Sequence, residues 1–375
     1  MAIGPTSARR GPVGVGLIGA GNISGEYLRN LTRFPDTRVV AIGDLAPALA
    51  EAKAAEFGTA NAGDVSVVLG DPGVEIVVNL TVPTAHADVA MAAVRAGKHV
   101  WNEKPLTTDR ATAAELLAAA DRAGVRVGGA PDTFLGSGLQ AARRLVDERA
   151  IGTPLSAIAS MTSPGPDAWH PNPAFFVQPG AGPLFDIGPY YLTALVQLLG
   201  AVESVAAVGS IARSTRLVGS GPLAGQTFPV DTPSHVAALY RFVGGASAQA
   251  TFSFDAPQFR YALEISGTDG TLILPDPNLF GGEICIRRPD GSGPESLETT
   301  TGRSTRGTGV LDMARAIRAG RPHRADGALA FHVLDTMVAT LEAAERATTV
   351  AIASRVSPAP PLPDDWDPDA ATLAS

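Results

Sequence analysis

A single cysteine, Cys285, stands among the 375 residues, so the chain cannot form an internal disulfide. The first thirty residues contain no charged segment followed by an apolar stretch, which is the pattern of a secretory signal. No run of apolar residues reaches the roughly 18 that a membrane-spanning helix needs. These absences predict a soluble, cytoplasmic protein with no membrane partner.

Positive charge is scarce relative to negative charge. The 29 Lys and Arg residues stand against 37 Asp and Glu residues, which gives a formal net charge of −8 at pH 7. Because an acidic surface repels phosphate backbones, we expect no nucleic-acid partner. The 45% hydrophobic content is typical of a globular protein, and the length exceeds the roughly 250–300 residues that one core usually holds, which predicts two domains.

The first part of the chain alternates apolar strands with amphipathic helices. Residues 1–12 show no apolar periodicity and are expected to form a flexible arm. Over residues 13–130 each strand is followed by a helix, which is typical of a parallel sheet covered on both faces. The strands are expected at Val13–Ile18, Arg38–Gly43, Val74–Val82, His99–Asn102 and Val125–Gly129.

Residues 131–355 follow a different pattern, in which apolar and polar side chains alternate strictly. Ala246–Phe254 and Phe259–Ile265 predict strands of an antiparallel meander, and Gly244-Gly245 predicts the hairpin turn before the first of them. One face carries small hydroxyl and amide side chains, which fits a subunit interface and an ordinary exposed face equally well. Residues 356–375 are Pro-rich and acidic, and are expected to be loosely ordered.

A glycine-containing turn joins the first strand to the first helix. Gly19 permits a tight turn, and Gly21 lets backbone amides approach a pyrophosphate at the positive end of the helix dipole. We count Asn22 and Ile23 with them as cofactor-binding candidates. Ser24 replaces the usual third glycine, which governs helix–strand packing. Taken alone, the motif also fits an ordinary strand-to-helix turn.

Asp44 supplies the context that favours a dinucleotide site. It ends the second strand, 23 positions after Gly21, where a carboxylate binds the adenosine ribose hydroxyls. Such a carboxylate repels a 2′-phosphate, and the following Leu45-Ala46-Pro47 offer no compensating cation. The sequence therefore predicts NAD, with NADP disfavoured.

Further candidates follow two other strands at the edge where parallel sheets bind ligands. Lys104 lies between Glu103 and Pro105, and a cis peptide at this proline would aim the lysine into a cleft, although a lone lysine can also be a solubilising charge. Thr81, Pro83 and His86 are expected near the nicotinamide ribose, together with Glu103. Helix capping or packing is the alternative for His86.

The segment from Gly180 to Tyr191 holds a possible acid–base group. Pro189 predicts the first turn of a helix that runs to Leu199, which would place Asp186 and Tyr190 on one face at the helix entrance. A phenol with its ordinary pKa of about 10 is a poor base unless a cation favours phenolate. Lys104 and the nicotinamide ring could supply that charge, and a buried aromatic residue capped by Asp is the alternative.

With these motifs, the chain resembles the Gfo/Idh/MocA oxidoreductases, the family of glucose–fructose oxidoreductase and inositol dehydrogenase. The resemblance runs from Val13 to about Ala353 and includes Ile265–Leu272. It implies an α/β protein with an N-terminal Rossmann domain and a C-terminal α+β domain built on a large, mostly antiparallel open sheet. It also implies a homodimer or homotetramer formed through that sheet.

The resemblance implies hydride transfer between NAD(P) and a secondary alcohol or ketone carbon of a sugar or cyclitol. Lys104 takes the position of the catalytic lysine, Asp186 lines the active site and Tyr190 fills the acid–base position. Many members carry His at that position and Asp three residues later. Tyr190 and Thr193 resemble the glucose–fructose oxidoreductase type, which argues against inositol dehydrogenase activity.

Substrate contacts are expected from Asp132, with Thr133, and from Trp169-His170, an aromatic ring beside a hydrogen-bonding ring. Trp169 could instead anchor the core, and His170 could be an exposed loop residue. We assign no metal ligands. Three rival functions remain open: an NAD-dependent glycosidase of the same family, a non-catalytic NAD- or sugar-sensing protein, and an adaptor that recruits another protein through the sheet.

Overall fold

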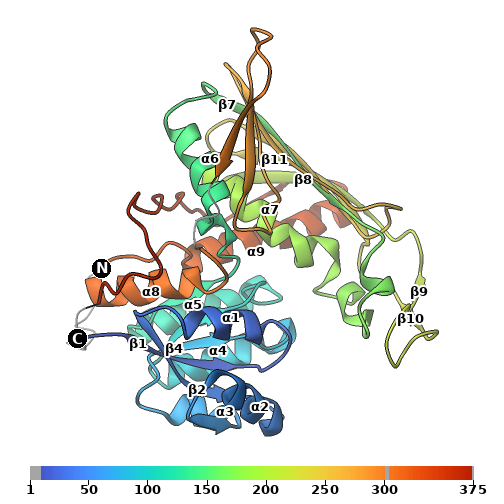
Figure 1. The fold of residues 1–375 in the computed structure, drawn as a ribbon. Helices are drawn as coiled ribbons and strands as arrows, with labels where there is room; N and C mark the ends of the chain where they lie inside the picture. The colour runs from blue at the N-terminus through green and yellow to red at the C-terminus, as the bar shows by residue number, and fades with distance from the viewer. Residues whose placement is uncertain (1–9, 300–303, 374–375) are drawn as a thin grey trace. The chain divides into compact units, whose positions relative to one another are not determined.

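The computed structural model describes residues 10–299 and 304–373, which form two compact units (Figure 1). The first unit holds residues 10–135, 304–331 and 362–373, and the second holds residues 136–299 and 332–361. Residues 1–9 of the expected arm lie outside the described residues. Sequence reasoning expected one continuous second domain, whereas the chain returns to the first unit twice.

Within its described residues, the first unit contains a six-stranded sheet in the order β3-β2-β1-β4-β5-β6, drawn in blue to cyan in Figure 1. All its pairings are parallel, and β1, β4 and β5 are buried along their whole length. This confirms the predicted Rossmann-like sheet. The strands are β1 Val13–Ile18, β2 Thr37–Gly43, β3 Asn61–Gly63, β4 Ile76–Asn79, β5 His99–Asn102 and β6 Val127–Gly129.

Helices connect these strands, and two of them end at a glycine. Gly58 and Gly124 adopt left-handed conformations, with φ of 72° and 67°, directly after α2 and α5. A later helix, α8, packs closely on β5, because a Cβ atom at Gly309 would lie 2.0 Å from the Trp101 ring. The helices are α1 Ser24–Leu31, α2 Pro47–Phe57, α3 Val65–Gly70, η1 Pro83–Ala85, α4 His86–Arg95, α5 Arg110–Ala123 and α8 Thr308–Ala319.

The end of the described chain packs on the first unit, contrary to the loosely ordered tail expected for residues 356–375. The carboxylate of Asp36 accepts hydrogen bonds from the backbone amides of Thr372 and Leu373, both at 2.9 Å, and pairs with Arg315 at 2.7 Å. The Trp366 ring lies 4.6 Å from the Arg315 guanidinium carbon. Composition indicated disorder, but these hydrogen bonds to a residue more than 330 positions earlier and the stacked guanidinium hold the segment in place.

Within its described residues, the second unit contains a nine-stranded sheet in the order β16-β15-β14-β13-β7-β12-β11-β8-β17. The β11–β12 hairpin turns at the predicted Gly244-Gly245. The expected direct meander was wrong in one respect, because β7 lies between β12 and β13 and pairs in parallel with β12. The strands are β7 Pro154–Thr162, β8 Val202–Ser210, β11 His235–Phe242, β12 Ser247–Ser253, β13 Arg260–Gly267, β14 Thr271–Ile273, β15 Gly282–Arg287, β16 Glu295–Thr299 and β17 Val350–Ala351.

Helices cover one face of this sheet. The Tyr191 ring lies 5.7 Å from the Phe252 ring in an edge-on contact, and the Tyr240 hydroxyl hydrogen-bonds to that of Thr340 at 3.1 Å. These helices are α6 Ser137–Asp147, α7 Gly182–Leu199 and α9 Gly327–Arg346, and a small hairpin of β9 Thr215–Leu217 and β10 Thr227–Pro229 stands apart from the sheet. No helix in the described part of the chain is both long and apolar enough to span a membrane.

Buried histidines make the stability of the fold depend on pH. Burial lowers the pKa of His99, His323 and His332 from 6.5 to about 4. His332 must stay neutral at Nε2, which accepts a hydrogen bond from the backbone amide of Val202 at 2.9 Å. Between pH 6.5 and about 4 the unfolded chain therefore binds protons that the folded protein does not, so the free energy of unfolding falls as the pH is lowered.

We expect a lower urea midpoint at about pH 5 than at about pH 7.5. Burial raises the pKa of Asp132, to about 6, and that of Asp276, and protonation of these carboxyls in the folded state offsets part of the loss. His332→Gln should reduce the number of protons taken up on unfolding at low pH by about one, and so weaken the pH dependence of the free energy of unfolding. Equal midpoints at the two pH values in the wild type would contradict the prediction.

Candidate functional site

The turn after β1 has the geometry of a pyrophosphate-binding loop. Gly19 has a φ of 102°, and a Cβ atom there would lie 2.7 Å from the carbonyl carbon and oxygen of Leu80, so the turn passes directly against the end of β4. Gly21 is exposed, and a Cβ atom there would meet nothing within 4 Å. The backbone at Gly21 is therefore open to a ligand, as NAD binding requires.

The start of α1 completes this anion site. Ser24 is fully buried and its hydroxyl donates to the Gly21 carbonyl at 2.6 Å, so the serine takes the place of the third glycine without leaving its hydroxyl unpaired. The cap residue Ile23 provides no side-chain acceptor for the first-turn amides, and Asn22 beside it is exposed. The positive end of the helix dipole thus faces the open turn.

Asp44 lies beside the same turn, at the end of β2. One carboxylate oxygen accepts from the backbone amide of Ala20 at 2.7 Å, and the other accepts from that of Ala46 at 2.9 Å. Each oxygen keeps a second lone pair for a ribose hydroxyl. No cation stands next to it in the sequence, where Leu45 is 92% exposed, so the side chain can favour NAD over NADP.

Asp44→Asn is expected to weaken NAD⁺ binding roughly 10-fold, because a hydrogen bond to a charged acceptor becomes a neutral one. NADP⁺ binding should strengthen or stay level, since repulsion of the 2′-phosphate is removed. Calorimetric titration measures the ratio of the dissociation constants for NAD⁺ and NADP⁺. Substitution of the exposed Asp121 by Asn is the matched control. An unchanged ratio would mean that Asp44 only braces the turn.

Two buried asparagines, which sequence reasoning missed, join the loops after β4 and β5. The Asn79 amide donates to the side-chain oxygen of Asn102 at 3.0 Å, and its own oxygen accepts from the Thr81 hydroxyl at 2.7 Å. Asn102 in turn donates to the Leu106 carbonyl at 3.0 Å. The sequence did contain a signal for this pair: an asparagine ends each of two strands whose preceding residues are mainly apolar, and buried amides must be hydrogen-bonded.

His86 also links these loops and does not face outward. Its ring is 1% exposed, with Nδ1 2.7 Å from the Pro105 carbonyl oxygen and Nε2 3.1 Å from that of Thr81. Burial lowers the pKa of His86. This position favours the packing alternative over a cofactor contact. The neighbouring Pro83 is the first residue of η1, a helix position that proline favours because it needs no backbone N–H there.

Glu103 holds the main chain of Lys104. The Glu103 carboxylate is 8% exposed, and it accepts from the Tyr27 hydroxyl and from the Lys104 backbone amide, both at 2.8 Å. It therefore faces inward, and the expected cofactor contact by Glu103 is not supported. The Lys104–Pro105 peptide is cis, and the Lys104 side chain is partly exposed just beyond β5.

Asp132 caps a helix, and its burial does not support the expected substrate contact. It is fully buried, and one oxygen accepts from the backbone amides of Gly307 and Gly309 at 2.9 and 3.0 Å, at the N-terminus of α8. Burial raises its pKa to about 6. The neighbouring Thr133 is also buried. Sequence reasoning missed this role because the capped amides lie about 175 positions further along the chain.

The helix that carries Asp186 and Tyr190 begins earlier than expected. α7 starts at Gly182 and has Pro183 in its first turn, so Pro189 lies inside the helix and cannot donate to the carbonyl of the residue four positions earlier. Asp186 and Tyr190 still share a face one turn apart. Asp186 is partly exposed and Tyr190 is 5% exposed.

Trp169 lies on the surface of the second unit, with 66% of its area exposed, which excludes the core-anchor alternative. The His170 ring lies 5.4 Å from it in an edge-on contact. Phe175 and Phe176, which sequence reasoning did not single out, stack at 4.1 Å beside His170. The two predicted residues thus belong to a larger group of aromatic rings.

Comparisons with known proteins decide the family. A family model described as an oxidoreductase family with an NAD-binding Rossmann fold matches residues 13–129, and the GFO/IDH/MocA C-terminal domain matches residues 139–273. A dTDP-3,4-didehydro-2,6-dideoxy-alpha-D-glucose 3-reductase of Actinomadura kijaniata is 32% identical, over 76% of this chain and 82% of that protein. The chain belongs to the GFO/IDH/MocA oxidoreductase family. The predicted family, α/β fold, NAD cofactor and enzyme class are confirmed.

Other similar proteins agree with this assignment. A 1,5-anhydro-D-fructose reductase of Ensifer adhaerens is 28% identical, over 74% of this chain and 78% of that protein. An NAD-binding oxidoreductase of Klebsiella pneumoniae has 25% identity and a TM-score of 0.81, covering 92% of this chain and 100% of that one. Levoglucosan dehydrogenase with NADH and L-sorbose shares the fold, at 23% identity and a TM-score of 0.80 over 91% and 99% of the chains. This family comprises NAD-dependent oxidoreductases of sugars and cyclitols.

Proposed function

We propose that the protein transfers a hydride between NAD and a secondary alcohol or ketone carbon of a sugar or cyclitol. One observation carries the proposal: Lys104 follows β5 at the same sheet edge where the open turn at Gly21 and the carboxylate of Asp44 form the dinucleotide site. Parallel sheets bind ligands at this edge. The curated relatives named as sugar reductases support the substrate class.

The chain's own residues would bind the substrate and move its proton. When bound, the nicotinamide ring supplies the hydride acceptor or donor. In the oxidation direction, the Lys104 ammonium donates a hydrogen bond to the reacting oxygen and stabilises charge there. The hydroxyl proton passes to the phenolate form of Tyr190, which becomes a neutral phenol as the carbon loses its hydride, and Asp186 lines the site on the same helix face. Reduction runs through the same groups in reverse.

An NAD⁺-reduction screen tests the function. Monosaccharides, inositols and anhydrosugars are each incubated with NAD⁺ while absorbance near 340 nm is followed, and keto sugars are tested with NADH. We expect at least one ring compound to react with the wild type. Cleavage of a glycoside without net NADH would indicate the glycosidase alternative, and no reaction with any compound would overturn the proposal.

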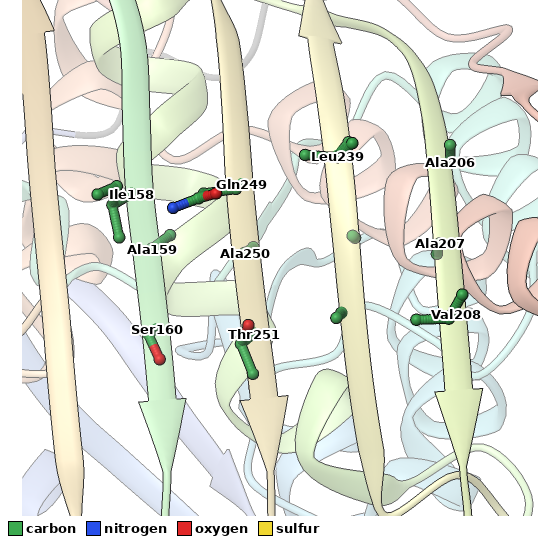
Figure 2. A pocket seen from close by; sticks show the side chains of 12 residues that line it. Ile158, Ala159, Ser160, Ala206, Ala207, Val208, Leu239, Gln249, Ala250 and Thr251 are labelled. Atoms are coloured by element: carbon green, nitrogen blue, oxygen red, sulfur yellow. The ribbon is translucent and has the colours of Figure 1, made fainter.

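The proposal includes self-association through the open face of the nine-stranded sheet. Figure 2 shows Ile158, Leu239 and Val208 on this face, and these apolar side chains are 40%, 62% and 66% exposed. Small residues such as Ala206 and Thr251 also line the hollow in this face. An apolar sheet face of this kind is typical of a subunit interface. Light scattering should give two or four times the 38.4 kDa chain mass, and a monomer would contradict it.

A further inference from the structure

Four aromatic rings gather on one surface loop of the second unit, and we call them the aromatic platform: Trp169, His170, Phe175 and Phe176. Ring centroids are 4.1 to 6.3 Å apart in stacked and edge-on contacts. Trp169 and Phe175 are nevertheless 66% and 42% exposed. The rings therefore support one another while leaving aromatic area in contact with water, and such exposed apolar groups mark binding sites.

A buried arginine fixes the loop that carries the platform. The Arg216 side chain is 1% exposed and pairs with Asp167 at 2.8 Å and with Asp255 at 2.7 Å. It also donates to the carbonyls of Pro164 and Phe254. Burying a charge is costly unless it is paired and hydrogen-bonded, and both terminal nitrogens of Arg216 are paired and bonded in this way. These ion pairs and hydrogen bonds of Arg216 hold the loop in one conformation before any ligand binds, which lowers the entropy cost of binding.

A polar group accompanies the rings. His170 Nδ1 accepts a hydrogen bond from the backbone amide of Asn172 at 3.1 Å, so the neutral ring carries its proton on Nε2. This N–H is a donor within the platform. A flat apolar surface with a donor beside it is complementary to a closed sugar ring, which has C–H groups on its faces and hydroxyl oxygens around its edge.

The platform lies next to the helix of the proposed reaction. Phe175 and Phe176 belong to η4 (Ala174–Val177), which contacts α7, the helix of Asp186 and Tyr190. The Val177 carbonyl also accepts from the backbone amide of Asp231 at 2.9 Å, which secures the end of η4. A ring held on the platform is thus bound by the same unit that supplies the proton-handling residues.

We propose that the aromatic platform binds one face of a closed sugar ring, with Trp169 stacking on the ring and His170 Nε2–H donating to a hydroxyl. This inference rests on the proposed function and narrows its substrate class to cyclic sugars. Open-chain polyols, which present no flat face, bind weakly.

The kinetic test compares Trp169→Ala with Phe259→Ala, a matched control that removes a 59% exposed aromatic ring elsewhere in the second unit. With the most active ring compound of the screen, Trp169→Ala should raise KM roughly 10-fold and leave kcat nearly unchanged, because stacking acts on binding. Trp169→Phe should restore most of the affinity. Phe259→Ala should match the wild type.

Saturation-transfer NMR provides a readout that needs no turnover. With levoglucosan and sorbitol as probes, the wild type and Phe259→Ala should saturate only the levoglucosan C–H signals, and Trp169→Ala should lose that transfer. Equal KM values and equal transfer for Trp169→Ala and Phe259→Ala would overturn the platform while leaving the oxidoreductase function in place. Transfer lost in Trp169→Ala, with no sugar able to reduce NAD⁺, would support the platform and reject the proposed function.

Discussion

Lys104→Ala is expected to reduce kcat by about 10²–10³-fold or more, because a preorganised charge at the reacting oxygen is lost together with its positioning effect. The main chain should stay in place, since Glu103 accepts from the Lys104 backbone amide, which the substitution to alanine keeps. NAD⁺ affinity and the melting temperature should therefore change little. Steady-state kinetics, calorimetry and thermal unfolding measure the three quantities.

The composition of the chain sharpens this test. Lysine occurs only at positions 53, 98 and 104. Lys98 is buried and donates to the carbonyls of Asp71 and Val74, and Lys53 pairs with Glu56 on the surface of α2. Lys53→Ala is thus a control that removes one ammonium group outside the site. If Lys104→Ala were as active as Lys53→Ala, the solubilising-charge alternative would hold for Lys104.

Tyr190→Phe is expected to reduce turnover about 10²–10⁴-fold, the usual contribution of a positioned general acid or base. The ring is 5% exposed, and Phe preserves its packing, so the protein should remain folded. The pH dependence of kcat should also change, because the proton would have to pass to solvent. Rates measured from about pH 6 to about pH 10 test both effects.

The adjacent tyrosine provides a matched control. Tyr191 is fully buried on the same helix and packs edge-on against Phe252, and its hydroxyl has no hydrogen-bond partner among the described residues. Tyr191→Phe should therefore leave both activity and stability near wild-type values. Comparable losses of turnover in the two variants would show that activity is sensitive to any change at this point of the helix. They would contradict the acid–base role of Tyr190.

Some features of the site could be predicted from the sequence because they depend on local chain geometry. Gly19 and Gly21 follow a strand and precede a helix, and Asp44 ends the next strand, so their positions follow from a single βαβ unit. The burial of polar side chains could not be predicted in this way. A sequence places Glu103 and Asp132 after strands, but it does not reveal that both turn inward.

Strand pairing between distant parts of the sequence could not be predicted either. Alternation in β12 and β13 correctly indicated which residues face the helices, yet it carried no information about β7, which separates the two strands. The beginning of α7 could not be predicted, because Pro189 indicates the first turn of a helix, whereas the helix begins seven residues earlier, at Gly182.

The interrupted first unit has a consequence for how the protein is made. Its α8 and the segment that donates to Asp36 are encoded after most of the second unit. Domains usually fold one after another as they leave the ribosome, but here the nucleotide-binding half must wait until almost all of the chain has been translated before its last hydrogen bonds can form. A partly made first unit therefore lacks the contacts of α8 and of Thr372 even when β1 to β6 are all present.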